Sequence, residues 1–191
     1  MTTTDITSDW PEASRIAAQR VIDEFGEPHE ATGSQLTWFH VGDAKRIVAK
    51  REFAHHDFPV PHTDSIETTI AYRVPLELAG DILSFNGSVC VNRTLGELTV
   101  TCHDLASNRL ALNIVDEMVR GSLTWHEARD YYGKEFLDCH RGKPAPFRER
   151  LRMFSDDNAP DPDERTLSDD DVVVAEAEGV RREELREDAL V

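Results

Sequence analysis

The residues best suited to chemistry lie in the segment 55–67, which includes His56, His62, Asp64 and Glu67. Imidazole nitrogens and carboxylate oxygens are donors that zinc, iron and manganese take in proteins. One hypothesis is therefore that this segment binds a divalent metal, with His56, His62 and Asp64 as candidate ligands. The alternative is a solvated loop whose histidines pair with neighbouring carboxylates, because a histidine-rich tract is only a weak signal.

Two features weigh against a metal in this segment. The spacing of its histidines matches no standard metal-binding signature. Pro59 and Pro61 fall between His56 and His62, and proline favours an extended backbone, so we expect the two imidazoles to lie apart. The favoured prediction is that these side chains help to bind a small polar ligand, with a divalent metal as the one cofactor to test.

A second polar set follows the predicted strands. Glu67 and Arg73 share one face of the alternating segment 66–74, and Asn92 and Glu97 lie on the polar face of the next hairpin. If these strands are neighbours, carboxylate, guanidinium and amide groups form a surface that can recognise a small polar ligand. The alternative is an exposed sheet face with cross-strand ion pairs, each of which contributes little to stability.

The tripeptide Cys102-His103-Asp104 resembles a nucleophile followed by its base. Adjacent residues of a strand point to opposite faces, so we expect no hydrogen bond between Cys102 and His103 and assign Cys102 to the core. The sequence contains no G-x-S-x-G, P-loop, G-x-G-x-x-G, H-E-x-x-H or C-x-x-C motif.

Two functions stay open at this stage. The first is a binding module for a small polar ligand or a protein partner, favoured because no catalytic set is complete. The second is a metal-assisted enzyme, a hydrolase or an isomerase, built on His56, His62, Asp64 and Glu67.

The elements that position these residues follow from the hydrophobic period. Apolar residues recur at helical spacing in three segments and alternate with polar residues in the others. The predicted helices are 11–25, a short one after Pro75, 105–121 and 124–136, and the predicted strands lie in 35–53, 66–74 and 89–102. The order α-β-β-β-α-β-β-α-α predicts an α+β fold, with an antiparallel sheet of about five strands and helices packed on one face.

The last hairpin can be given a register. A two-residue turn at 95–96 places Val91 opposite Val100 and Val89 opposite Cys102, so that these apolar side chains share one face.

The chain divides into two parts. Residues 1–142 form the predicted domain, and residues 143–191 form an acidic, mostly disordered tail with a possible short helix at 175–189. Residues 151–191 hold 5 basic and 14 acidic side chains, which is a net charge of −9 out of −16 for the whole chain. Residues 155–171 are rich in Asp, Pro, Asn and Ser, which bury too little apolar area to offset the entropy of ordering.

The charge pattern limits the partners. Only 4 of the 21 basic residues are lysines, and a carboxylate-rich, lysine-poor surface favours solubility in concentrated salt, which indicates a halophilic protein. The alternative is an ordinary acidic protein with an acidic tail. In both cases the negative charge disfavours nucleic acid and anionic membranes as partners.

The sequence predicts a cytoplasmic protein. No apolar run reaches the length of a membrane span, and residues 1–11 lack the features of a secretion signal. The three cysteines show no paired spacing, as expected for reduced thiols.

Four segments resemble a family of short, uncharacterised bacterial and archaeal proteins. They are HDFPVPHTDSIE (56–67), YRVP (72–75), NGSVCVNRTLGEL (86–98) and NRLALNIVDEMVRG (108–121). The resemblance spans about residues 12–136, within the uncertainty of element boundaries. It implies no activity, and Asp57 and Asn92 depart from the family pattern, which has Asn and Glu at these places.

Overall fold

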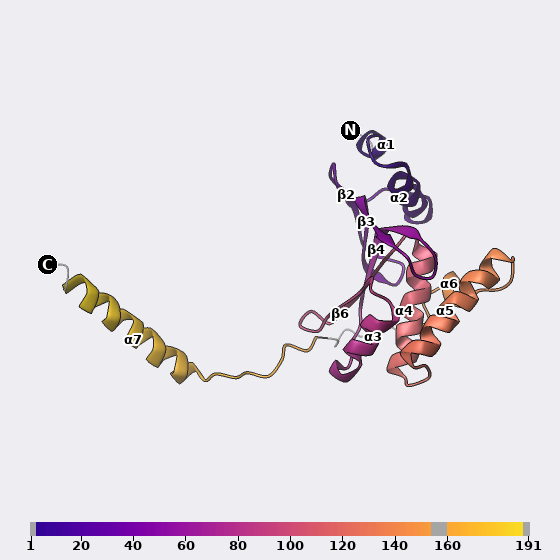
Figure 1. Cartoon of the computed structure of the whole chain (residues 1–191). Coiled ribbons are helices and arrows are strands. Elements are labelled where there is room, and N and C mark those ends of the chain that lie inside the picture. The colour runs from indigo at the N-terminus through magenta and orange to yellow at the C-terminus, as the bar shows by residue number, and fades with distance from the viewer. Residues whose placement is uncertain (1–2, 154–159, 189–191) are drawn as a thin grey trace. The chain divides into compact units, whose positions relative to one another are not determined.

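The computed structural model describes residues 3–153 and 160–188. The chain divides into two compact units, Met1–Asp161 and Pro162–Val191. The first unit contains the sheet and the helices that cover it (Figure 1). Among the described residues, no helix has the length and apolar character that crossing a membrane requires.

The sheet of the first unit has six strands, all antiparallel, in the order β1-β2-β3-β4-β6-β5. They are β1 (Glu30–Ala31), β2 (Gln35–Val41), β3 (Ala44–His56), β4 (His62–Ala71), β5 (Val89–Asn92) and β6 (Glu97–Cys102). The predicted α+β fold with an antiparallel sheet is confirmed. The strand beyond the expected five is β1, which has only two residues and follows no alternating pattern that the sequence could reveal.

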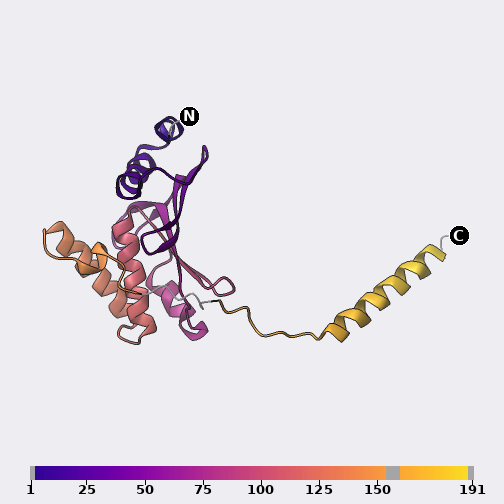
Figure 2. The ribbon, with the colours of Figure 1, turned by 180° about the vertical axis from the view of Figure 1, so that it is seen from behind.

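The helices of this unit are α1 (Thr3–Thr7), α2 (Glu12–Phe25), the 3-10 helix η1 (Leu76–Leu78), α3 (Ala79–Phe85), α4 (Leu105–Val119), α5 (Trp125–His140) and α6 (Pro146–Glu149). The views in Figures 1 and 2 place α2, α4 and α5 on the same side of the sheet. The other face carries the polar strand residues, as alternation along a half-buried strand requires.

Two apolar clusters join the helices to the sheet. One lies under α2 and includes Trp38, Ile47 and Ile66. The larger one lies around α4 and includes Leu98 and Leu110. Burial of each such side chain contributes about 1.5–3 kcal/mol to the stability of the fold. This packing therefore fixes α4 against the sheet near the end of β6.

The caps of the two long helices follow the sequence signals. The Asp104 side chain accepts a hydrogen bond of 2.7 Å from the Ser107 N–H and caps α4. Thr124 and Glu127 form a capping box at the start of α5, at the residue where the sequence predicts this helix to begin. Capping satisfies backbone N–H groups that have no partner within the helix, so α4 starts at a fixed point directly after β6.

The register predicted for the last hairpin is wrong by two residues. Val91 pairs with Leu98, and Val89 pairs with Val100, because residues 93–96 form a four-residue connection instead of a two-residue turn. A shift of two residues preserves the faces of both strands. The apolar side chains therefore still point to the helices.

The predicted domain boundary at residue 142 is also wrong. The first unit continues to Asp161, and Phe147 and Met153 are buried in the larger core cluster. In the second unit, α7 (Asp169–Asp188) begins six residues before the predicted short helix, and residue 189 of that prediction lies outside the described residues.

Candidate metal centre

The hairpin of β3 and β4 brings two predicted site residues together. His56 and His62 are direct cross-strand partners, and their ring centroids lie 5.0 Å apart. The expectation that the prolines between them would keep them apart is wrong. Residues 57–61 close a hairpin, and both imidazoles lie at the start of its stem.

Asp64 lies between these two histidines. Its Oδ1 is 2.9 Å from His62 Nε2, and its Oδ2 is 3.1 Å from His56 Nδ1. The Ser88 hydroxyl donates a hydrogen bond of 2.5 Å to the same Oδ2, and the Asn86 side chain holds the Ser88 backbone in place at 2.9 Å. Oδ1 is buried and makes no hydrogen bond of good geometry. The carboxylate is thus held through one oxygen, while the other faces His62.

The thiol of Cys102 joins the same group. Its Sγ lies 3.4 Å from His62 Nε2 and 3.3 Å from His103 Nδ1. The expectation that Cys102 and His103 could not meet is wrong, because β6 ends at Cys102. Strand alternation does not extend to His103, whose ring folds back toward the sulfur as the chain turns into α4. The assignment of Cys102 to the core is confirmed, since it is buried.

The outer nitrogens of the two rings each face an acceptor. His62 Nδ1 lies 2.8 Å from the Val60 carbonyl oxygen. His103 Nε2 lies 3.4 Å from Asp104 Oδ2 and 3.5 Å from Ser107 Oγ. A carbonyl oxygen and an ionised carboxylate can only accept, so both outer nitrogens carry the proton. In neutral imidazoles the inner nitrogens then present their lone pairs to Cys102.

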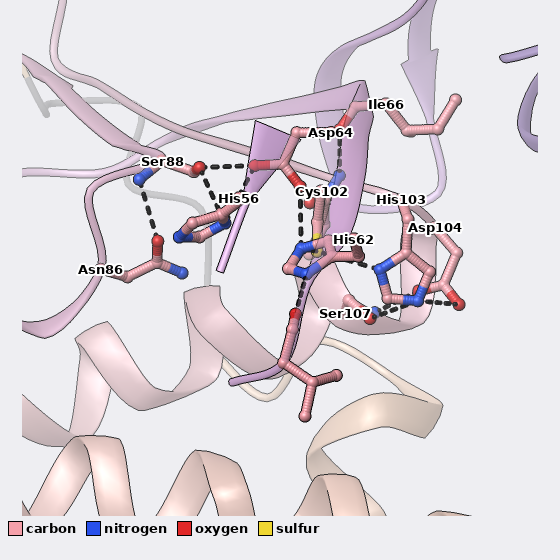
Figure 3. A network of polar contacts seen from close by, with 12 residues as sticks. His56, His62, Asp64, Ile66, Asn86, Ser88, Cys102, His103, Asp104 and Ser107 are labelled. Atoms are coloured by element: carbon pink, nitrogen blue, oxygen red, sulfur yellow. Dashed lines mark hydrogen bonds and ion pairs between the residues drawn. The ribbon is translucent and has the colours of Figure 1, made fainter. Parts of the chain in front are cut away.

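These side chains form two overlapping groups of potential ligands (Figure 3). Within each group, all the ligand atoms lie within 4.8 Å of one another. The groups are His62, Cys102 and His103, and His56, His62 and Asp64. Together they are called the His/Cys cluster below. Bond lengths to zinc imply a nitrogen–sulfur separation of about 3.5 Å around a tetrahedral ion, which is close to the two separations at Cys102.

Protons occupy the cluster when no metal is present. The ion pair with Asp64 and the contact with Cys102 raise the pKa of His62 to about 10. Burial lowers the pKa of His103, but its contacts with Asp104 and Cys102 prevail and raise it to about 9. Burial raises the pKa of the Cys102 thiol, yet the two imidazoles hold it below its usual range. The two rings therefore favour the protonated state, and they shift Cys102 toward the thiolate.

Exposure differs across the cluster. The Asp64 side chain is only 2% exposed, and Cys102 is 4% exposed. The His56 and His103 side chains are 19% and 32% exposed. The two outer rings are thus partly open to solvent, whereas the thiol and the carboxylate are buried behind them.

The remaining predicted site residues lie elsewhere. Glu67 and Glu97 are on the outer face of the sheet, where they pair with Lys50 and Lys45 at 2.7 Å each. Arg73 follows the end of β4, which stops at Ala71 instead of residue 74. The structure therefore brings together His56, His62 and Asp64, and separates them from Glu67.

Asn92 has a local contact in the last hairpin. Its Oδ1 accepts a hydrogen bond of 3.1 Å from the Leu95 N–H, within the connection between β5 and β6. Recognition of a small polar ligand by Glu67, Arg73, Asn92 and Glu97 stays a prediction.

Sequence reasoning missed four members of the site. They are Ser88, Cys102, His103 and Asp104. The tripeptide at 102–104 carried the signal, because a cap residue such as Asp104 marks the end of a strand and the start of a helix. No comparable sequence signal indicates Ser88.

Comparison with known proteins gives no relative. No protein-family model, no curated protein and no solved structure matches this chain. The resemblance to a family of short bacterial and archaeal proteins therefore stays a prediction.

Proposed function

We propose that this protein binds a divalent transition metal ion, zinc by its donor set, through His62 Nε2, Cys102 Sγ and His103 Nδ1. Asp64 Oδ1 lies beside His62 Nε2, at 2.9 Å, and is the next available donor. Three protein donors are the number found in catalytic zinc sites, where a further position is left for water or substrate. This number of donors favours the metal-assisted enzyme as the function of the site.

The observation that carries the proposal is the orientation of the two imidazoles. Metal-binding histidines almost always donate their other N–H to a carboxylate, a backbone carbonyl or water, which fixes the ring and its tautomer. His62 has the Val60 carbonyl in that place, and His103 has Asp104. Both inner nitrogens face the same sulfur, and a bound dication would take the place of the protons between these atoms.

The donor types favour zinc over iron. Thiolate and imidazole suit zinc, whereas two histidines and a carboxylate with open positions suit iron(II). The latter set requires His56 Nδ1 as a ligand. That nitrogen lies 3.1 Å from Asp64 Oδ2 and 3.3 Å from Ser88 Oγ, so it is engaged in holding the carboxylate. In the group with Cys102, His62 Nε2 also lies near Asp64, at 2.9 Å from Oδ1, but there the carboxylate can serve as a further donor to the same ion, and His103 Nδ1 faces the sulfur at 3.3 Å.

The experiment is metal analysis of full-length protein purified without an affinity tag. We expect about one zinc ion per chain after incubation with zinc and removal of excess metal, because the donors converge before any ion is added. Cobalt substitution adds a signature, since a thiolate ligand gives a charge-transfer band in the near ultraviolet.

Cys102→Ser and Cys90→Ser make a matched pair for this experiment. Cys90 is exposed on the opposite face of the sheet. We expect the Cys102 variant to lose zinc and the cobalt band, and the Cys90 variant to keep both. A stoichiometry near zero in the unsubstituted protein, unchanged by added zinc or cobalt, contradicts the proposal.

A reactive thiol is the second candidate, favoured by the placement of Cys102 between two imidazoles. Reactive cysteines are thiolates held by nearby positive charge, and the pKa of Cys102 is lowered by both rings. Its burial admits only small reagents. Rapid alkylation of Cys102 by iodoacetamide in a protein that takes up no metal would favour this function, and modification of only Cys90 and Cys139 would contradict it.

A further inference from the structure

A segment beyond the predicted domain packs across α4 and α5, and we call residues 145–153 the strap. The Asn113 side chain of α4 donates hydrogen bonds to the carbonyl oxygens of Phe147 and Arg150, at 3.0 and 2.8 Å. Its Oδ1 accepts the Arg152 N–H at 2.7 Å. One buried amide thus binds three backbone groups of the strap, which fixes its path over α4.

A buried carboxylate of α5 fixes the same segment. The Phe147 N–H lies 3.3 Å from both carboxylate oxygens of Glu135, and Glu135 is only 2% exposed. The Tyr131 hydroxyl donates to Glu135 at 3.0 Å and orients it. The Phe147 ring is buried in the larger core cluster. The strap is therefore held by hydrogen bonds on two helices and by an aromatic anchor.

The strap directs one guanidinium toward the His/Cys cluster. Arg148 donates a hydrogen bond of 3.1 Å to Ser107 Oγ, and its other terminal nitrogen lies 3.5 Å from Asp104 Oδ2. The side chain is only 11% exposed. Ser107 Oγ and Asp104 Oδ2 are the two atoms that face His103 Nε2. Arg148 thus contacts both groups that orient this ring.

We propose that Arg148 is a positioning residue of the metal centre, and that the strap and the bound metal stabilise each other through Asp104 and His103. This inference rests on the proposed function. Asp104 Oδ1 caps α4, while Oδ2 lies near His103 and Arg148, with the more exposed Arg20 further away at 4.0 Å. A guanidinium at Oδ2 holds the carboxylate plane in place for the His103 N–H, and the carboxylate in turn directs His103 Nδ1 at the metal position.

The coupling is reciprocal. If docking of Arg148 raises the affinity for zinc by some factor, bound zinc must favour docking of the strap by the same factor. Loss of a group that orients a metal-binding histidine typically reduces metal affinity by about 10–100-fold. Arg148 acts one contact further away, so we expect about a tenfold effect, at the lower end of that range.

The experiment compares full-length Arg148→Met and Arg148→Lys with Arg150→Met, a change in the same strap at an exposed side chain. Zinc affinity is measured by competition with a chelator, and the cobalt charge-transfer band reports the geometry at Cys102. We expect about a tenfold weaker affinity and a shifted band for Arg148→Met. Arg148→Lys should recover part of the affinity, because its charge reaches Asp104 without the second donor for Ser107.

Hydrogen exchange gives the reciprocal measurement. Zinc should slow exchange of the Arg152 amide, which the Asn113 side chain binds, by about the same tenfold factor in the unsubstituted protein, and by much less in Arg148→Met. The inference is overturned if Arg148→Met binds zinc as tightly as Arg150→Met does, or if both arginine changes weaken binding equally. Absence of zinc binding by the unsubstituted protein would instead contradict the proposed function.

Discussion

The two faces of one sheet carry polar side chains that are arranged differently. On the outer face, Glu67 and Glu97 each have a lysine at 2.7 Å, and Arg46 lies within 4 Å of both carboxylates. Each negative charge there meets a positive one. The two charges of each pair neutralise each other, so this face offers little unpaired charge to attract a ligand.

The inner face shows the opposite arrangement. At the end of β6, a thiol and two imidazole nitrogens converge, and the Asp64 carboxylate has one oxygen without a hydrogen bond. Donor atoms of the types that bind metal ions converge there on one sulfur. A set of charged residues in a sequence therefore indicates a binding site only when the fold makes like groups converge.

The largest expected effect is the stabilisation of the fold by zinc. A ligand that binds only the native state at a thousandfold excess over its dissociation constant adds about 4 kcal/mol of stability. Thermal unfolding with zinc and with chelator measures this difference. Cys90→Ser should keep the shift, and Cys102→Ser should lose it. Equal zinc-induced shifts of the melting temperature in the two variants would mean that zinc does not bind at Cys102 on the inner face.

The next effect is the pH dependence of zinc affinity. Zinc must displace the protons of its ligands. His62 and His103 have pKa values raised to about 10 and about 9, so both are protonated at neutral pH. Between about pH 6 and 8 the affinity should rise up to about hundredfold per pH unit, tenfold for each displaced proton. Chelator competition across this range measures the slope, and a flat profile contradicts the assignment.

The metal-free protein should show the opposite trend in stability. The folded pKa of His62, about 10, lies above the ordinary value of 6.5. Its stabilising contribution is thus complete below about pH 6.5 and is lost as the pH rises through 10. Chemical denaturation with chelator present measures this decline.

Asp64→Asn should have a smaller effect. It keeps the shape of the side chain and removes the charge next to His62 Nε2. We expect zinc affinity to fall by about 10–100-fold, while Asp57→Asn, a change at an exposed loop residue, leaves it unchanged. Equal affinities in the two variants would show that Asp64 serves only to hold Ser88 and His56.

The smallest effect belongs to the outer face. Glu67→Gln removes an ion pair with the partly exposed Lys50, which should cost about 0.2–1 kcal/mol of unfolding free energy. Urea denaturation measures the loss. Zinc affinity should not change, and a tenfold change would mean that the two faces are coupled.

Much of the fold could be predicted from hydrophobic periods and caps. Alternation in 66–70 and the capping box at Thr124 identify a strand and a helix correctly, because both are local signals. The register of the last hairpin could not be predicted, since a shift of two residues leaves the same side chains facing the core. The strap was missed because its few apolar residues, such as Phe147, Leu151 and Met153, alternate with arginine and glutamate and form no long periodic pattern.

The site was predicted only in part. His56, His62 and Asp64 stand close in the sequence, so their types drew attention, but the hairpin that joins them depends on strand pairing over 44–71. Cys102 and His103 were expected on opposite faces because strand alternation was extended past the end of β6. The Asp104 cap of α4 marks the end of β6 locally, but the contact of the His103 ring with the sulfur depends on how the chain turns after that end.

Zinc-edge X-ray absorption of the loaded protein shows which atoms bind the ion and so tests whether His62, Cys102 and His103 share it. We expect one sulfur at about 2.3 Å and imidazole nitrogens at about 2.0–2.1 Å from the zinc. A coordination shell of nitrogen and oxygen without sulfur would contradict it.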